Sequence, residues 1–323
     1  MTKNKQEYRQ IRHNMISMGN PIYGAIALFN SVSEGTILKH SNALCKDSFF
    51  RSAVVGKCFP ATVSNMSTCG NLPHFSDLRK TLGWYILGLC SESKSICDFL
   101  SLREQFDYAF LHGQYDHCLI LLDLSHQKFG RSFWEIKNQI AVLSEKKGLD
   151  SQRNYANSII DEMKKGGLEA YLIYAYSKQC ERSVSVGSFL NTLERDYERF
   201  IKNGVVDVMG KYLHYKALGN LLSVEEKSWL IDDKIINSFL YFDNKYSLID
   251  RYISLCSIVE NVFAHGSNQL RELFIPYVQK LNAVVSDPFF KNIVSQYNNH
   301  YFYFHTTNNE RICQAFDLYS LWL

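Results

Sequence analysis

Residues 109–148 read AFLHGQYDHCLILLDLSHQKFGRSFWEIKNQIAVLSEKKG, and this stretch decides the class of fold. Gly113, Gly130 and Gly148 divide it at intervals of 17 and 18 residues. Each interval fits one helix and its turn, because a glycine just past a helix end can adopt the left-handed conformation that closes the helix. The stretch therefore predicts consecutive helices joined by short turns.

Apolar residues recur at helical spacing between these glycines. Tyr115, Cys118 and Leu122 follow one another at steps of three and four, and Ile136 and Ile140 are four apart. Residues at this spacing lie on one face of a helix. We therefore expect Leu122 and Ile140 to be buried.

The helix after Gly130 carries signals at both of its ends. Ser132 and Glu135 form the Ser-x-x-Glu pattern, in which each side chain bonds the backbone amide of the other residue. Two lysines precede Gly148, where positive charge suits the negative end of the helix dipole. These signals predict a helix between Ser132 and Gly148.

The helical pattern extends far beyond this stretch. Residues 74–275 contain no proline over 202 positions, although an average sequence would place about ten there. Proline is the residue that helix interiors tolerate least. We expect helices at residues 168–180, 185–202, 205–218 and 246–263, and a helix at 270–281 that Pro276 kinks or breaks.

The two ends of the chain differ from the middle. Residues 1–75 hold three of the five prolines and a polar stretch at 62–71, so we expect an irregular or mixed N-terminal cap. Residues 76–283 form the predicted helical-repeat-like array. Residues 284–323 form a C-terminal segment in which HYFYFH, residues 300–305, has the alternation of a short strand.

The array resembles tetratricopeptide-like helical-repeat proteins over about residues 95–167. Gly113, Tyr115 and Leu122 stand where that family has its turn glycine, an aromatic residue and a large core residue, while Cys118 replaces the usual alanine. Two glycine intervals span 35 or 36 residues, close to the family's helix-pair period of about 34. The resemblance implies an all-α fold, a solenoid of antiparallel helix pairs, with irregular caps at both ends.

Net charge, cysteine content and the length of apolar runs indicate the kind of partner and the cellular compartment. The net charge of +3 is small for a dedicated nucleic-acid binder. Nucleic acid is therefore a possible partner, but the sequence does not indicate it. The nine cysteines are odd in number and form no CxxC pair, which favours free thiols and a cytoplasmic location. No apolar run reaches the roughly 20 residues that span a bilayer, so we expect no membrane contact. The sequence also carries no recognised cofactor-binding motif, so we expect no cofactor.

Catalytic motifs are scarce. No GxSxG, HExxH or GxGxxG pattern occurs, and no arginine precedes a histidine at the spacing used by helical ribonucleases of the HEPN type. Asp232 and Lys234 match the Asp-x-Lys fragment of metal-dependent nucleases. A solvent-exposed helix start is the alternative interpretation of Asp232, and it is the one that we favour.

One group of residues is a candidate for zinc. Cys45, Cys58, Cys69 and His74 are thiols and an imidazole, the ligand types that zinc prefers. Their spacing matches no compact zinc module. Structural cysteines and a structural histidine are therefore the favoured interpretation.

The sequence thus predicts a non-catalytic scaffold or regulatory subunit that binds another protein or peptide, or a second copy of itself. Helical arrays present extended faces for such binding. The resemblance also suggests a bacterial multi-component system of the defence or toxin type. Two alternatives stay open: an effector enzyme that acts on nucleic acid, and the sensor or oligomerisation region of a longer protein.

Overall fold

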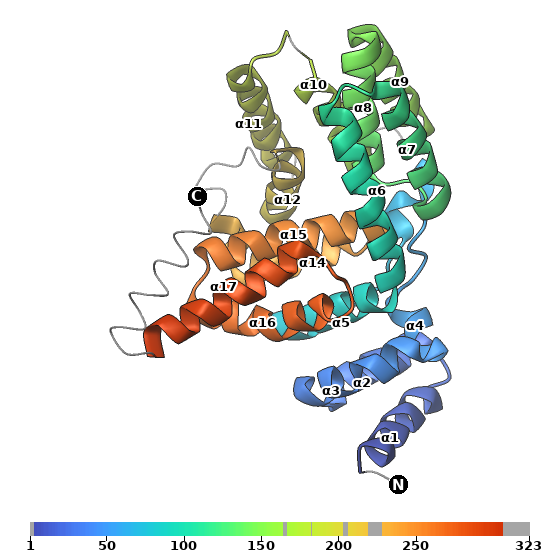
Figure 1. Cartoon of the computed structure of the whole chain (residues 1–323), viewed down its shortest axis with the longest axis vertical. Coiled ribbons are helices and arrows are strands. Elements are labelled where there is room, and N and C mark those ends of the chain that lie inside the picture. The colour runs from blue at the N-terminus through green and yellow to red at the C-terminus, as the bar shows by residue number, and fades with distance from the viewer. Residues whose placement is uncertain (1–2, 164–166, 182, 203–205, 219–227, 306–323) are drawn as a thin grey trace.

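The computed structural model describes residues 3–163, 167–181, 183–202, 206–218 and 228–305, and every regular element among them is helical. The all-α prediction is confirmed (Figure 1). The elements, in chain order, are α1 (Lys3–Ser17), α2 (Pro21–Ser31), α3 (Glu34–Lys46), α4 (Ser48–Val54), η1 (Val63–Thr68), α5 (Leu78–Ser91), α6 (Ser93–Leu111), α7 (Tyr115–Phe129), α8 (Phe133–Lys147), α9 (Leu149–Glu162), α10 (Leu168–Gln179), α11 (Val186–Lys202), α12 (Asp207–Leu218), η3 (Ser228–Ile231), α14 (Asp233–Asp243), α15 (Leu248–His265), α16 (Asn268–Asn282) and α17 (Pro288–His305).

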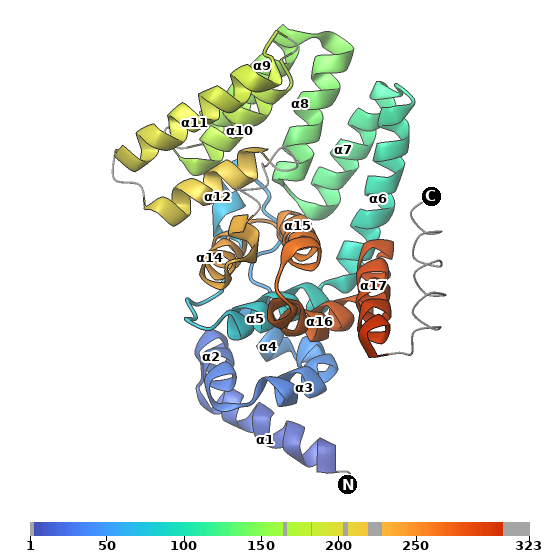
Figure 2. The ribbon, with the colours of Figure 1, turned by 90° about the vertical axis from the view of Figure 1, so that its left-hand side faces the viewer.

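Helix α5 lies at the centre of the molecule. It packs against α3 and α4 on one side and against α14 and α16 on the other, as Figure 2 shows. A helix that is apolar on all sides is expected to be buried on all sides, and α5 is buried continuously from Thr81 to Cys90. The main hydrophobic core around it includes side chains from Ile11 to Phe290.

Helices α6 to α10 form a consecutive array. Each packs against the next one along the chain, and α8 also contacts α10. Short turns connect α6, α7, α8 and α9, so these neighbours run antiparallel (Figure 2). Gly113, Gly130 and Gly148 occupy the turns with positive φ angles of 68°, 70° and 82°, which confirms the glycine punctuation. The further glycine at this spacing, Gly166, lies outside the described residues.

The residues predicted to organise this array lie where the sequence placed them. Leu122 and Ile140 are buried, and Tyr115 begins α7 with its ring edge-on to Phe110. The Ser132 hydroxyl accepts a hydrogen bond from the Glu135 backbone N–H at 3.1 Å, which caps α8. The sequence signals here are local, and local geometry satisfies them.

The expected irregular or mixed cap at residues 1–75 needs correction. Helices α1 to α4 occupy most of residues 3–54, and only the connection around η1 is irregular. Pro21 stands in the first turn of α2, where a missing N–H costs nothing, and the Asn20 side chain caps the same turn. In the sequence alone, a proline that starts a helix resembles a proline in a loop.

The strand predicted at residues 300–305 is wrong, because α17 continues to His305. The Asp287 side chain accepts from the Phe289 N–H at 2.9 Å, and Pro288 fits the first helical position. Pro276 lies inside α16 without ending it. Buried neighbours such as Phe274 and Tyr277 hold that helix in place, so tertiary packing outweighs the lost hydrogen bond.

Candidate functional site

Asp232 begins α14 as its N-cap. Its carboxylate accepts hydrogen bonds from the Lys234 N–H at 2.9 Å and the Ile235 N–H at 3.0 Å. Asp232 thus occupies a helix start, which is the interpretation that we favour from the sequence. In the part of the chain that the structure describes, no group of three or more His, Cys, Asp or Glu side chains lies close enough to hold a metal ion.

The four zinc candidates, Cys45, Cys58, Cys69 and His74, likewise form no group of three ligands in the described part of the chain. Cys45 donates its thiol to the Leu87 carbonyl on α5, and His74 lies edge-on to the ring of Tyr241. Cys58 and Cys69 are buried in the connection around η1, where burial raises the pKa of the first thiol to about 11 and of the second to about 12. All eight cysteines among the described residues are free thiols.

Glu135 has a second role besides its place in the first turn of α8. Its carboxylate is buried, lies 2.5 Å from the Arg131 guanidinium, and has the imidazole Nδ1 of His126 at 3.9 Å. Burial raises the pKa of Glu135 to about 7, against the opposing effect of Arg131. The capping pattern predicted the backbone contact but not this buried ion pair.

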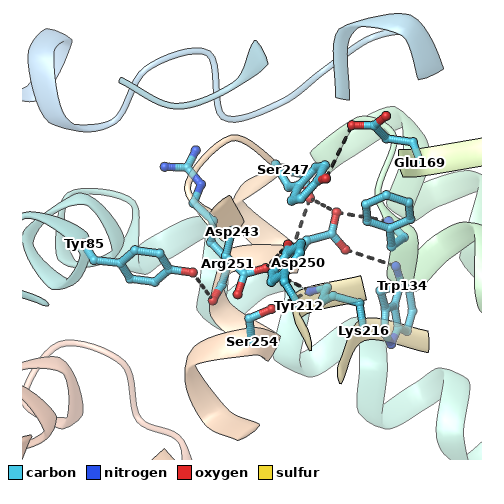
Figure 3. Close-up of polar contacts among 12 residues, drawn as sticks. Tyr85, Trp134, Glu169, Tyr212, Lys216, Asp243, Ser247, Asp250, Arg251 and Ser254 are labelled. Carbon is cyan, nitrogen blue, oxygen red and sulfur yellow. Dashed lines mark hydrogen bonds and ion pairs between the residues drawn. The ribbon is translucent and has the colours of Figure 1, made fainter. Parts of the chain in front are cut away.

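Buried polar side chains of α8, α12, α14 and α15 are connected by hydrogen bonds, and we call them the polar network. Asp250, at the start of α15, lies at its centre (Figure 3). Its carboxylate accepts from the Phe133 N–H at 3.0 Å, the Trp134 N–H at 3.2 Å and the Ser247 hydroxyl at 2.8 Å. Burial raises the pKa of Asp250, while the Lys216 ammonium and these donors oppose the rise. Asp250 therefore caps α8 from a helix more than a hundred residues away in sequence.

A second buried carboxylate, Asp243, holds α12 against α14. One of its oxygens accepts from the Tyr212 hydroxyl at 2.7 Å and from the Lys216 ammonium at 3.0 Å. Lys216 also donates to the Ser254 hydroxyl on α15 at 2.6 Å. One ammonium therefore joins α12, α14 and α15 (Figure 3).

A cavity of about 490 Å³ lies beside this network, between α8, α10, α12 and α15. Its walls combine aromatic rings, two lysines, amides and hydroxyls. They are formed by Phe133, Trp134, Lys137, Asn138, Tyr176, Gln179, Tyr215, Lys216, Leu218, Asp250, Ile253, Ser254 and Ser257. Ligand sites in proteins commonly have this size and this mixture of apolar walls with a few convergent polar groups.

The second candidate is a surface on the α6–α7 hairpin, which we call the α6–α7 surface. It exposes four large apolar side chains: Tyr108 (61%), Leu111 (82%), Ile120 (56%) and Leu124 (46%). A groove of about 510 Å³ runs between the two helices and includes Gln105 and Leu124 in its lining. The Asp98–Lys128 ion pair, at 2.9 Å, spans the same groove.

Sequence reasoning missed the residues of the polar network and the cavity. Asp250 and Lys216 stand among apolar residues of buried helices, and this was the available signal, because charged side chains are seldom buried unless paired. Their partners could not be read from the sequence. Phe133 and Asp250, for example, belong to helices that meet only in the folded chain.

Comparisons of this chain with protein-family models, with curated proteins and with solved structures found no match. The likeness to tetratricopeptide-like repeats therefore rests on residues 95–167 alone. Within the described ranges, the longest helices lack the run of apolar residues needed to cross a bilayer.

Proposed function

We propose that this protein is a non-catalytic scaffold or regulatory subunit that binds another protein or peptide through the α6–α7 surface. The observation that carries the proposal is the exposure of Tyr108, Leu111, Ile120 and Leu124 on one hairpin. Single exposed apolar residues are common, but a group of them on adjacent helices is typical of an interaction site.

On each of the two helices, exposed side chains follow at helical spacing, which supports a continuous contact face. Ser101, Gln105 and Tyr108 follow at steps of four and three along α6, and Ile120 and Leu124 are four apart on α7. Such residues lie along one side of their helix. The ring of Tyr108 stacks on His112 with 4.1 Å between centroids, so the aromatic anchor is held in a defined position.

The helix order of α6 to α10 supports the same proposal. In a tetratricopeptide-like solenoid each helix pair contacts only its neighbours and leaves one face available for a partner. The α6–α7 hairpin would be the first pair of such an array. Its apolar face would then provide the anchors, and the Asp98–Lys128 pair part of a polar rim.

Pull-down from the native host with a charge-neutral surface variant tests this proposal. Ile120→Ser combined with Leu124→Ser should abolish capture of a reproducible partner and leave the melting temperature nearly unchanged, because both side chains are exposed. Tyr23→Ser, at an equally exposed position on α2, is the matched control and should retain the partner. Equal capture by the double variant and the control would refute the α6–α7 surface as the binding face.

If the partner is a second copy of the chain, the same variants decide it. Light scattering would then show a dimer for the Tyr23→Ser protein and a monomer for the double variant. We further propose a cytoplasmic, reducing location. Thiol titration in denaturant without reductant should detect nearly all nine cysteines, and two or more stable disulfides would contradict this location.

A further inference from the structure

The α6–α7 surface carries an excess of negative charge, although the chain as a whole is positive. Residues 93–129, which form α6, α7 and their turn, contain five aspartates and glutamates against three lysines and arginines, whereas the whole chain has a net charge of +3. One of the three basic side chains, Lys128, is already paired with Asp98. The other four carboxylates of the hairpin are exposed: Glu104, Asp107, Asp116 and Asp123.

On α6, each exposed carboxylate lies one helical turn from an exposed apolar side chain. Glu104 precedes Tyr108 by four residues, and Asp107 precedes Leu111 by four. Residues at this spacing are neighbours on one face of a helix. Arg103 is close enough to act on Asp107 electrostatically, but it forms no ion pair with either carboxylate within the described ranges.

The same arrangement recurs on α7 around Ile120. Asp116 stands four residues before Ile120, and Asp123 stands three residues after it. Asp116 pairs with Lys146 of α8, whereas Asp123 has no ion pair in the described part of the chain. The apolar anchors of this surface are therefore framed by carboxylates, three of which are not neutralised by an ion pair.

The groove between α6 and α7 has the form that accepts a helix. It has a volume of about 510 Å³, and its lining includes the almost fully buried Leu102 and Leu121 together with the exposed Ser101 and Gln127. Ridges of side chains on one helix pack into the grooves of its neighbours. An amphipathic helix places an apolar anchor into such a groove every three or four residues.

We propose that the α6–α7 surface binds an amphipathic helix whose polar face is basic. This inference names the class of partner for the proposed function and rests on it. The apolar side chains of the partner helix contact Ile120 and Leu124 along the groove. Its lysines or arginines pair with the three carboxylates that form no ion pair: Glu104, Asp107 and Asp123. Complementary charge of this kind speeds association and selects the partner.

Fluorescence anisotropy of the full chain with two labelled peptides tests the proposal. Both peptides have about 18 residues, enough for roughly five helical turns, and both carry leucine at helical spacing. One has lysine at its remaining positions and the other has glutamate. The leucine–lysine peptide should bind with a Kd below about 100 μM, and the leucine–glutamate peptide at least about tenfold more weakly. Equal binding of the two peptides, tighter binding of the glutamate peptide, or binding of neither would overturn the proposal.

Charge variants locate the basic side chains of the bound helix. A triple variant, Glu104→Gln with Asp107→Asn and Asp123→Asn, should weaken the leucine–lysine peptide about tenfold, because it removes three exposed ion pairs. The matched control removes the same charge from exposed carboxylates of α9, α11 and α16: Asp161→Asn, Glu194→Gln and Glu272→Gln. The control should bind like the unmodified protein. Equal affinity of the triple variant and the control would refute the assignment.

The pull-down from the native host separates this inference from the proposed function. If the triple variant captures the partner as well as its control while Ile120→Ser with Leu124→Ser loses it, the surface is the binding face but its partner is not basic. If the serine double variant also captures the partner, the proposed function itself fails. A dimer of the chain that persists in the triple variant and dissociates in the serine double variant would identify a second copy as the occupant and overturn the inference.

Discussion

Replacement of Asp250 by alanine should destabilise the protein strongly, because this side chain caps α8 from inside the core. Its loss leaves the N–H groups of Phe133 and Trp134 without their acceptor, together with the Ser247 hydroxyl. A buried donor without a partner costs about 1–3 kcal/mol. Removal of a buried carboxylate, whose pKa burial raises, offsets part of this cost. We therefore expect a net loss of about 2–4 kcal/mol in the free energy of unfolding.

Urea unfolding followed by circular dichroism at 222 nm measures this loss. Asp232→Ala is the control, because Asp232 caps α14 in the same way but at an exposed helix end. An exposed N-cap is worth about 1 kcal/mol. Asp250→Asn should fall between the two, since its amide oxygen still accepts one bond. If Asp250→Ala costs no more than Asp232→Ala, the buried cap does not hold α8 as we describe.

Three further changes test the array. Leu122→Ala should cost about 2–5 kcal/mol in the urea assay, because Leu122 on α7 is buried in a cluster with residues of α6 and α8; a loss under 1 kcal/mol would contradict that burial. Gly130→Ala should lower the melting temperature much more than Gly113→Ala: both glycines have positive φ, but only at Gly130 would a Cβ meet the Pro60 carbonyl, at 2.4 Å. Glu135 has a pKa raised to about 7 in the folded state from an ordinary 4.5, so folding favours its protonated form. The stability that this shift contributes is complete below pH 4.5. As the pH rises to 7, the free energy of unfolding falls by roughly 3 kcal/mol. Glu135→Gln should remove this slope from the pH dependence of stability.

The middle of the fold could be predicted because its signals are local. A glycine with positive φ, such as Gly113, ends a helix whatever surrounds it. The side chain of Ser132 likewise reaches an amide only three residues away. The helices expected at 168–180, 185–202 and 246–263 appear within a few residues of those bounds, as α10, α11 and α15.

The prediction for the N-terminal end is wrong because one residue type has two uses. Pro21 and Pro288 each begin a helix, where the lost N–H would have had no partner. The proline alone does not distinguish a helix start from a loop. The residue before it does, because Asn20 and Asp287 are capping side chains that precede Pro21 and Pro288.

The polar network around Asp250 and the cavity beside it could not be predicted because they combine distant segments. Lys137 and Lys216 lie 79 positions apart in sequence, and no periodicity connects α8 with α12. Trp134 shows the same dependence on distant segments. Its ring contacts Phe99 and Phe106 of α6 with centroid distances of 4.9 and 5.4 Å, and it also lines the cavity between α8, α10, α12 and α15. Such contacts form only when the chain folds, so no local pattern in the sequence indicates them.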